Sequence, residues 1–308
     1  MQKSRILQRL TNKSPLIAPP AAASNGSRPR RFETPHPKLP SCPPTASTLT
    51  RRRLHDEEIL ALNTYDFLAY LGKAVINPGG TVGRNLLLAR LNPKPGSHVL
   101  EIGCGTGHTA CHIARRFRCR VTAVDISPAM IAQARQTVQA RGLGHIVKCE
   151  VADISALPFA QASFDYVVCQ AVLMFVDQAP ALQQLRRVLK PGGMFAGVEF
   201  GWRGTPPASV RQQTYDICGC RTLEFHHRGE WGYRLKQAGF DRVESKEQNF
   251  TMLSMTGFMR DEGLNSLKVL SRLLRRTASI KRLAGIWKHF SRHKNYFSYV
   301  VLAGRKLS

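Results

Sequence analysis

Three glycines at alternate positions follow an acidic residue in the segment LEIGCGTGHTACH, residues 100–112. The acid is Glu101, and the glycines are Gly103, Gly105 and Gly107. Because glycine has no Cβ, a loop of this composition lets a ligand lie directly against the backbone. The segment therefore predicts a loop that binds an anionic or nucleotide-like ligand.

The spacing of the glycines separates two kinds of cofactor. A dinucleotide-binding loop has the pattern G-x-G-x-x-G. Here the third glycine comes one position early, at Gly107, and His108 stands where that pattern needs a glycine. The spacing therefore argues against a nicotinamide or flavin dinucleotide, and no second domain for hydride transfer is apparent.

Strand-like and helix-like runs alternate on both sides of this loop. The strand-like runs are 97–102, 120–125, 146–151, 164–169 and 193–200, and the helix-like runs are 107–117, 127–141 and 179–189. This alternation predicts a parallel, doubly wound α/β sheet, in which ligands bind at the carboxyl ends of the strands. KPGG at 190–193 predicts a sharp stop before the fifth strand.

Five segments of the chain form a longer pattern. They are VLEIGCGTG (99–107), VTAVDIS (121–127), VADISALPF (151–159), FDYVVCQAVLMF (164–175) and RVLKPGGMF (187–195). In order and spacing they resemble the class I S-adenosylmethionine (SAM)-dependent methyltransferases over residues 57–250. The resemblance implies a Rossmann-like seven-stranded α/β sheet, methyltransferase activity and SAM as the cofactor.

The resemblance also assigns residues to the adenosine part of the cofactor. Asp125, at the end of the second strand, is expected to accept hydrogen bonds from both ribose hydroxyls. Ile126 and Met130 are expected to contact the adenine faces, and Asp153 with the Ile154 amide to bind the adenine edge. For the two aspartates, an ordinary role as loop caps is the alternative.

Glu101 resembles the family acid that organises the glycine loop and faces the amino group of the cofactor. The complete expected cofactor set is Glu101, Gly103, Cys104, Gly105, Gly107, Asp125, Ile126, Met130, Asp153, Ile154 and Gln170. No metal site is expected, because the eight cysteines of the chain form no C-x-x-C pair.

The end of the fourth strand bears on the methyl acceptor. Enzymes that methylate exocyclic base amines carry an Asn/Asp-Pro-Pro-aromatic run there, whereas this chain has CQAVLMF at 169–175. The difference favours a small-molecule enzyme resembling the methyltransferases of the ubiquinone, menaquinone and tocopherol pathways. Gln170 and then Glu199 are the predicted acceptor-side residues. Tyr65 resembles a tyrosine that closes over the cofactor in ubiquinone-pathway members, or it is an aromatic residue in helix packing.

The basic charge of the chain is concentrated at its two ends. The formal net charge is +25; residues 1–53 carry eleven Lys/Arg and one acid, and residues 250–308 carry twelve and two. Residues 1–53 lack apolar periodicity and predict a disordered basic extension before a methyltransferase domain at 54–308. The extension is either a targeting segment for a mitochondrion or plastid, or a plain basic tail of a cytoplasmic protein.

The methyltransferase domain is predicted to begin with a helical cap. A helical pattern runs from Asp56 to Leu71, NPGG (77–80) interrupts it, and Thr81 is expected to cap a helix that continues to Leu91. At the other end of the domain, DRVESKEQNF (241–250) and NYFSYVVLAGRK (295–306) fit the antiparallel strand pair with which class I enzymes end.

A basic insert at 251–294 separates these last two strands. GLNSLKVLSRLLRR (263–276) and SIKRLAGIWKHF (279–290) predict two amphipathic helices, with Leu264, Leu267, Leu270 and Leu274 forming one apolar face of the first. The apolar faces either pack on the domain as a substrate lid or contact an anionic membrane through 254–294. Nucleic acid is the least favoured partner, because no RNA-reading module is present.

The sequence therefore predicts a SAM-dependent methyltransferase that acts on a small-molecule or lipid-like acceptor. Contact of the insert with lipid would make it a peripheral membrane protein. The first alternative is an RNA or protein methyltransferase that docks through its basic ends. A second alternative is a non-enzymatic SAM-binding or scaffold protein, which the complete set of cofactor motifs disfavours.

Overall fold

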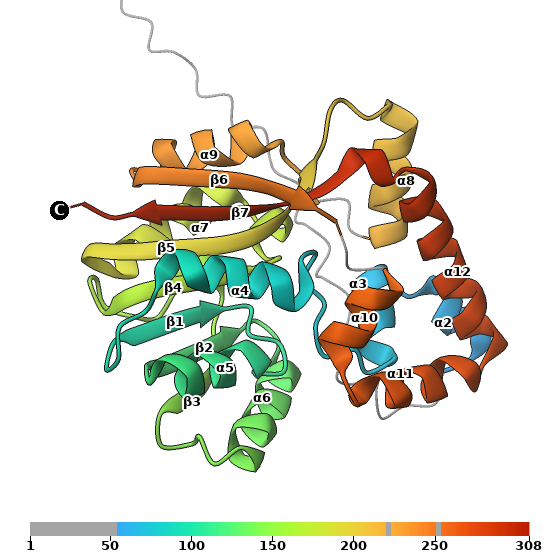
Figure 1. Ribbon diagram of the computed structural model, residues 1–308, viewed down its shortest axis with the longest axis horizontal. Helices are drawn as coiled ribbons and strands as arrows, with labels where there is room; N and C mark the ends of the chain where they lie inside the picture. The colour runs from blue at the N-terminus through green and yellow to red at the C-terminus, as the bar shows by residue number, and fades with distance from the viewer. Residues whose placement is uncertain (1–53, 220–222, 251–253, 308) are drawn as a thin grey trace, which may run out of the picture. The chain divides into compact units, whose positions relative to one another are not determined.

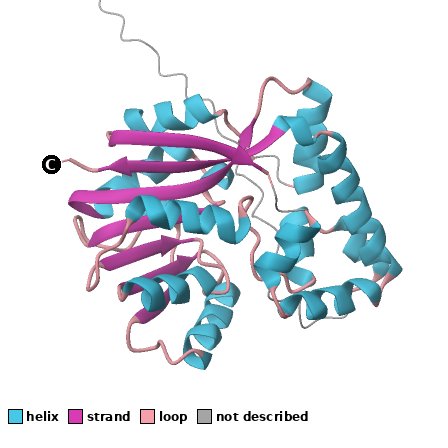
Figure 2. Cartoon of the chain, viewed as in Figure 1, coloured by secondary structure: helices cyan, strands magenta, loops and turns pink. Residues whose placement is uncertain are grey.

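The computed structural model describes residues 54–219, 223–250 and 254–307, which contain a seven-stranded sheet (Figures 1 and 2). The strands are β1 (His98–Ile102), β2 (Arg120–Asp125), β3 (Val147–Val151), β4 (Phe164–Gln170), β5 (Leu189–Trp202), β6 (Asp241–Asn249) and β7 (Phe297–Arg305). Their order is β3-β2-β1-β4-β5-β7-β6, and only β7 is antiparallel to its neighbours β5 and β6. The predicted fold class and the closing antiparallel pair are confirmed.

Helices cover both faces of the sheet (Figure 1), and apolar residues of the central strands belong alternately to two clusters. Val99 belongs to the cluster with α4 (Gly80–Leu91), α5 (His108–Phe117) and α6 (Pro128–Ala140). The next residue, Leu100, belongs to the cluster with α7 (Gln178–Val188) and α9 (Arg228–Gln237). Because both faces are covered, the central strands are nearly continuous apolar runs.

The strand register brings the carboxyl ends of the first four strands to one edge. Ile102, the last residue of β1, pairs with Val124 of β2 and Cys169 of β4. Asp125, the last residue of β2, pairs with Val151, the last residue of β3. The loops that carry the predicted cofactor residues therefore leave the sheet side by side.

Helices outside these two layers share a third apolar cluster, centred on Phe200, Trp202 and Phe297. They are α2 (Asp56–Ala61), α3 (Thr64–Tyr70), α8 (Ala208–Cys218), α10 (Met255–Glu262), α11 (Asn265–Leu274) and α12 (Thr277–Arg292). The N-terminal cap and the insert are thus parts of one helical body, in which α12 packs on α2. Within the described ranges, no helix is long and apolar enough to cross a membrane.

The N-terminal cap differs from its prediction in two details. The pattern from Asp56 to Leu71 forms two helices, because Asn63 caps α3 by accepting a hydrogen bond from the Asp66 amide at 2.8 Å. Thr81 does not cap α4: the N-cap residue is Gly79, and Thr81 instead forms hydrogen bonds to a residue of the insert.

The composition of the KPGG segment predicted a stop before the fifth strand, and this prediction is wrong. β5 begins at Leu189, directly after α7, and its pairing with β4 shifts register within this segment. The Gly192 amide donates a hydrogen bond to the Lys306 carbonyl oxygen at 2.7 Å. Because Lys306 directly follows β7, this contact holds the segment against the sheet. Gly193 is needed there, because a Cβ would lie 3.0 Å from the Asp165 carbonyl oxygen.

The insert contains three helices where the sequence predicted two. Ser254 caps α10 by accepting a hydrogen bond from the Gly257 amide at 3.0 Å. α10 ends at Gly263, whose φ of +52° favours glycine. Two further helices, α8 and α9, lie between β5 and β6, where the sequence offered no regular pattern to predict them.

Candidate active site

The loop after β1 presents an open stretch of backbone. A Cβ on Gly105 would meet no atom within 4 Å, although φ is +52°. At Gly103 a Cβ would lie 2.3 Å from Val172 Cγ2, and at Gly107 it would lie 3.1 Å from Ala134 Cβ. Gly103 and Gly107 are therefore glycines because of packing, whereas the open side of Gly105 is free to lie against a ligand.

Asp125 fixes this loop to the end of β2. Its Oδ2 accepts a hydrogen bond from the Gly105 amide at 2.9 Å, and its Oδ1 accepts one from the Ser127 amide at 3.0 Å. Burial raises the pKa of Asp125, and the two amides oppose that rise. Each carboxylate oxygen has a second lone pair for a ligand hydroxyl. The organisation of the loop, expected of Glu101, is thus performed at least in part by Asp125.

Glu101 lies beneath the loop and is 2% exposed. Burial and then the charge of Asp125 raise its pKa to about 8, against the backbone amide of Ala110 and the positive charge of Arg84. Its Oε2 is buried and has no hydrogen-bond partner among the described residues. An unpaired buried oxygen is costly, so a ligand ammonium group would stabilise this position.

The residues predicted for adenine flank the same edge of the sheet. Ile126 is 66% exposed, Met130 is half-buried, and Ile154 is buried at the start of the short helix η1 (Ile154–Ala156). Asp153 is exposed, and its Oδ1 accepts a hydrogen bond from the Ser155 amide at 2.8 Å. Asp153 therefore caps η1 and keeps its second oxygen for a ligand.

Gln170 lies between the helix that follows the glycine loop and the segment that precedes α4. Its Nε2 donates to Thr109 Oγ1 at 3.2 Å, and its Oε1 accepts from Asn77 Nδ2 at 3.2 Å. The other amide oxygen, Asn77 Oδ1, is buried and has no partner among the described residues. The contact between Asn77 and Gln170 therefore places Asn77 Oδ1, a hydrogen-bond acceptor that a ligand could use, beside the end of β4.

The segment that carries Asn77, residues 73–81, is held by the insert and is called the strap below. Glu262 of α10 accepts hydrogen bonds from Lys73 Nζ at 3.1 Å and from the Ala74 amide at 2.9 Å. The Lys73 and Glu262 side chains are only 3% and 0% exposed. A buried ion pair thus joins the first residue of the strap to α10.

Thr81, the last residue of the strap, is held by Asp261, which precedes Glu262 in α10. Asp261 Oδ1 accepts hydrogen bonds from the Thr81 amide at 2.9 Å and from Thr81 Oγ1 at 2.7 Å. These strap contacts were not predicted. A signal was present, because Asp261 and Glu262 are the two acids of the basic region 250–308.

Glu199, predicted on the acceptor side, and Tyr65, predicted to close over the cofactor, both contact the segment after β4. Glu199 is 0% exposed, and its Oε1 accepts hydrogen bonds from the Val172 and Leu173 amides at 3.2 and 3.1 Å. Tyr65 packs edge-on against Phe175 with 5.0 Å between ring centroids. Both residues shape the loop that borders Gln170; direct contact of either with a substrate stays a prediction.

Glu199 is expected to make stability depend on pH. Burial raises its pKa from 4.5 to about 8, so the folded state holds the proton more tightly than the unfolded state. Its contribution to stability is therefore complete below about pH 4.5 and is lost as the pH rises to about 8. Glu199→Gln cannot ionise, so the free energy of unfolding should decline less from pH 6 to pH 9 than in the wild type. Parallel profiles in urea unfolding would contradict this assignment.

Comparison with known proteins shows the family to which the chain belongs. The family model described as a methyltransferase domain matches residues 100–197. An uncharacterized methyltransferase of Bacillus subtilis (strain 168) is 33% identical over 180 residues, which are 58% of this chain and 75% of that protein. The chain belongs to the class I SAM-dependent methyltransferases.

One further sequence relative and one solved structure are similar to this methyltransferase. Phosphoethanolamine N-methyltransferase 1 of Arabidopsis thaliana is 28% identical over 183 residues, covering 58% of this chain and 35% of the plant protein. Phosphoethanolamine N-methyltransferase 2 of Haemonchus contortus, solved in complex with SAM, superposes with a TM-score of 0.65 at 22% identity. That alignment covers 85% of this chain and 60% of the nematode protein and shows the shared fold.

SAM is the cofactor of this methyltransferase, and the residues at the carboxyl edge of the sheet fit it. The unpaired Glu101 Oε2 suits its ammonium group, the open side of Gly105 admits its methionyl chain, and exposed Ile126 suits its adenine. When bound, SAM would supply an electrophilic methyl group on its sulfonium, with S-adenosylhomocysteine as the leaving group. The individual contacts assigned from the sequence stay predictions.

The residues of the methyltransferase can promote this reaction by positioning. Asp125 holds the backbone of the glycine loop, and Glu199 holds the loop after β4. Gln170 is oriented from both ends of its amide. Orientation of two reactants can supply a large part of a rate enhancement. Among the described residues, no group of three or more His, Cys, Asp or Glu side chains could hold a metal ion.

Proposed function

We propose that this methyltransferase transfers the methyl group of SAM to a small-molecule acceptor with a lipid-like part, at an anionic membrane surface. The observation that carries the proposal is the exposed face of α11 and α12, where apolar and basic side chains alternate. The enzyme would then be peripheral to a membrane, in the cytoplasm or in an organelle.

α11 exposes the apolar residues that its sequence pattern placed on one face. Leu264, Leu267 and Leu274 are 90%, 66% and 70% exposed, whereas Val269 is buried against the helical body. The packing face of α11 is therefore not the leucine face. With 100° per residue, Lys268 and the exposed Arg275 lie on the same side as these leucines.

α12 repeats this arrangement. Ile280 is 42% exposed and Trp287 is 56% exposed, and the exposed Lys281 and Lys288 lie beside them on the helix. Phe290 is buried in the helical body. Apolar side chains next to lysine and arginine suit a membrane interface, where each cation adds about 1 kcal/mol of attraction to anionic lipid.

The proposed acceptor class rests on the edge of the sheet and on the relatives. Gln170, the last residue of β4, is followed by AVLMF rather than by the run found in base-amine methyltransferases. The Arabidopsis relative is named for phosphoethanolamine, a small phosphorylated amine. Together with the apolar faces of the insert, these features support a small acceptor that partitions to lipid. RNA is less favoured, because an RNA-docking surface has no need of exposed leucines.

Vesicle binding and methyl transfer test this proposal together. The protein should co-sediment with vesicles of phosphatidylglycerol and phosphatidylcholine more strongly than with phosphatidylcholine alone. Leu267→Asp should weaken this binding about tenfold or more, because it removes an exposed leucine that would enter the lipid and adds a negative charge. Tyr233→Asp is the matched control, since Tyr233 is 60% exposed but lies on α9.

The same preparation can then receive methyl-labelled SAM and a cell extract. Label should enter the lipid-soluble fraction, and Leu267→Asp should lower that transfer while SAM affinity stays unchanged. Label in the RNA or protein fraction, or equal vesicle binding by Leu267→Asp and Tyr233→Asp, would overturn the proposal. SAM binding without transfer to any fraction would contradict the proposed acceptor class.

A further inference from the structure

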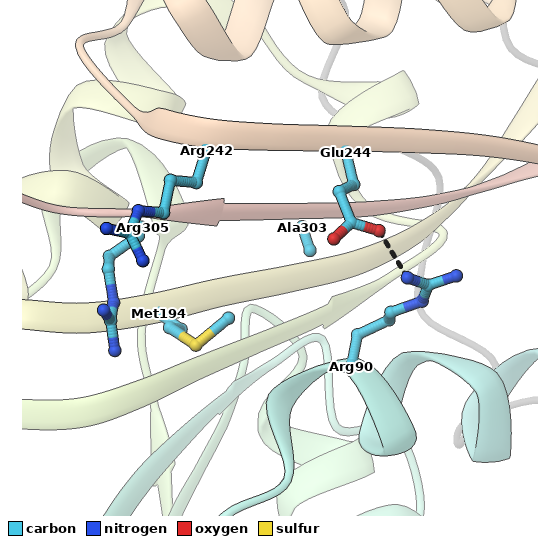
Figure 3. A pocket seen from close by; sticks show the side chains of 6 residues that line it. All are labelled: Arg90, Met194, Arg242, Glu244, Ala303 and Arg305. Atoms are coloured by element: carbon cyan, nitrogen blue, oxygen red, sulfur yellow. Dashed lines mark hydrogen bonds and ion pairs between the residues drawn. The ribbon is translucent and has the colours of Figure 1, made fainter.

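A cavity of about 240 Å³ lies where β6 begins and β7 ends. Figure 3 shows the six side chains that line it: Arg90, Met194, Arg242, Glu244, Ala303 and Arg305. Met194 pairs with Arg305, the last residue of β7, and with Tyr166 near the start of β4. The cavity is therefore separate from the carboxyl edge of the sheet, where the cofactor residues lie.

The backbone at Arg242 is arranged in an unusual way. Its φ is +48°, in the left-handed region that costs a non-glycine residue about 1–2 kcal/mol. The pairing of β6 with β7 shifts register between Asp241 and Glu244, so Arg242 lies in a bulge. A bulge changes the direction of a side chain, and here the Arg242 side chain points toward Arg305 (Figure 3).

The charges around the cavity are not balanced. Arg90 forms an ion pair with Glu244. Neither the Arg242 nor the Arg305 side chain has a hydrogen bond or ion pair to any residue that the structure describes. Arg305 Nε is moreover buried without a partner in that part of the chain. Two guanidinium groups without a counter-ion therefore meet at one cavity.

We propose that this cavity binds a soluble anion that carries a phosphate group. Three guanidiniums and one carboxylate leave two positive charges, which match a phosphomonoester dianion. A planar guanidinium can donate two hydrogen bonds to two oxygens of one phosphate group. The volume of the cavity is below that of a pocket for a drug-sized ligand. This inference is independent of the proposed acceptor and of the membrane surface.

The position of the cavity favours a soluble phosphate over a lipid headgroup. β7 starts at Phe297, just after the insert, and ends at Arg305 in the cavity. β6 starts at the cavity and ends at Asn249, before α10. The cavity therefore lies at the ends of these strands that are farthest from the basic helices of the insert.

Titration with glycerol 3-phosphate tests the site. At constant ionic strength, the midpoint of thermal unfolding should rise to a plateau with glycerol 3-phosphate and not with sodium chloride. Arg242→Gln and Arg305→Gln should each weaken calorimetric binding about tenfold or more, because each removes a charged hydrogen bond. Arg118→Gln is the matched control: Arg118 is exposed and also has a positive φ, of 55°.

Further arms of the experiment separate the alternatives. SAM affinity should be unchanged in all three variants, and unfolding in chloride shows that each variant is folded. An equal rise in chloride, or equal binding of glycerol 3-phosphate by the Arg242→Gln/Arg305→Gln double variant, would overturn the site. Binding to phosphatidic acid vesicles that needs both arginines, with no binding of glycerol 3-phosphate, would overturn the soluble ligand and assign a lipid headgroup.

Discussion

Replacement of Gly105 by leucine is expected to weaken SAM binding at least about 100-fold, which corresponds to about 2.8 kcal/mol, while the protein still folds. The Cβ direction of Gly105 is open, so an added Cβ meets no protein atom within 4 Å. It would instead occupy the space beside the loop that Asp125 holds. Calorimetric titration with SAM measures the loss.

Gly96→Leu is the matched control for this variant. Gly96 has a φ of +80° and also has no atom within 4 Å of an added Cβ. In both variants leucine must adopt a left-handed backbone conformation, which lowers the unfolding free energy by about 1–2 kcal/mol. Only Gly105→Leu should lose affinity for SAM. If the two variants bind SAM equally well, the open side of Gly105 is not the cofactor surface.

Removal of the Glu262 side chain is expected to cost about 3–5 kcal/mol of unfolding free energy. In Glu262→Ala, Lys73 would remain buried without its counter-ion, and the Ala74 amide would lose its acceptor. The effect is large because both charges are excluded from water. Urea unfolding at neutral pH measures it.

Two comparisons identify the buried pair as the cause. Glu247→Ala removes the acid of the Arg203–Glu247 pair, whose side chains are 39% and 27% exposed, and should cost about 0–1 kcal/mol. The double variant Lys73→Met/Glu262→Met should recover much of the stability lost in Glu262→Ala, because no lone charge remains. Equal losses in Glu262→Ala and Glu247→Ala would show that the strap does not depend on this pair.

The strap gives the insert a second role beside the one proposed for its exposed faces. Asp261 and Glu262 hold the two ends of the strap, and Asn77 between them contacts Gln170. The insert is thus connected to the edge of the active site by side-chain contacts. The sequence predicted the insert as a substrate lid or a membrane contact and did not predict this connection.

Patterns within short stretches were reliable guides to the fold. The β1–loop–α5 unit follows from an apolar run and from glycines that adopt positive φ, and both are local properties. At α11 the pattern predicted an apolar leucine face but left open whether that face packs on the domain or meets a membrane. Val269 packs on the helical body, because the neighbouring helices determine which side of an amphipathic helix is covered.

The sequence by itself determined the α/β order, the glycine loop, the acids at the strand ends and the family. Each depends on residues close together in the chain, whose backbone preferences act locally. Only the tertiary structure decided which side chains complete the site: Asn77 meets Gln170 across 93 positions and Lys73 meets Glu262 across 189. Such pairs form when packing brings distant segments together, and no local spacing records them.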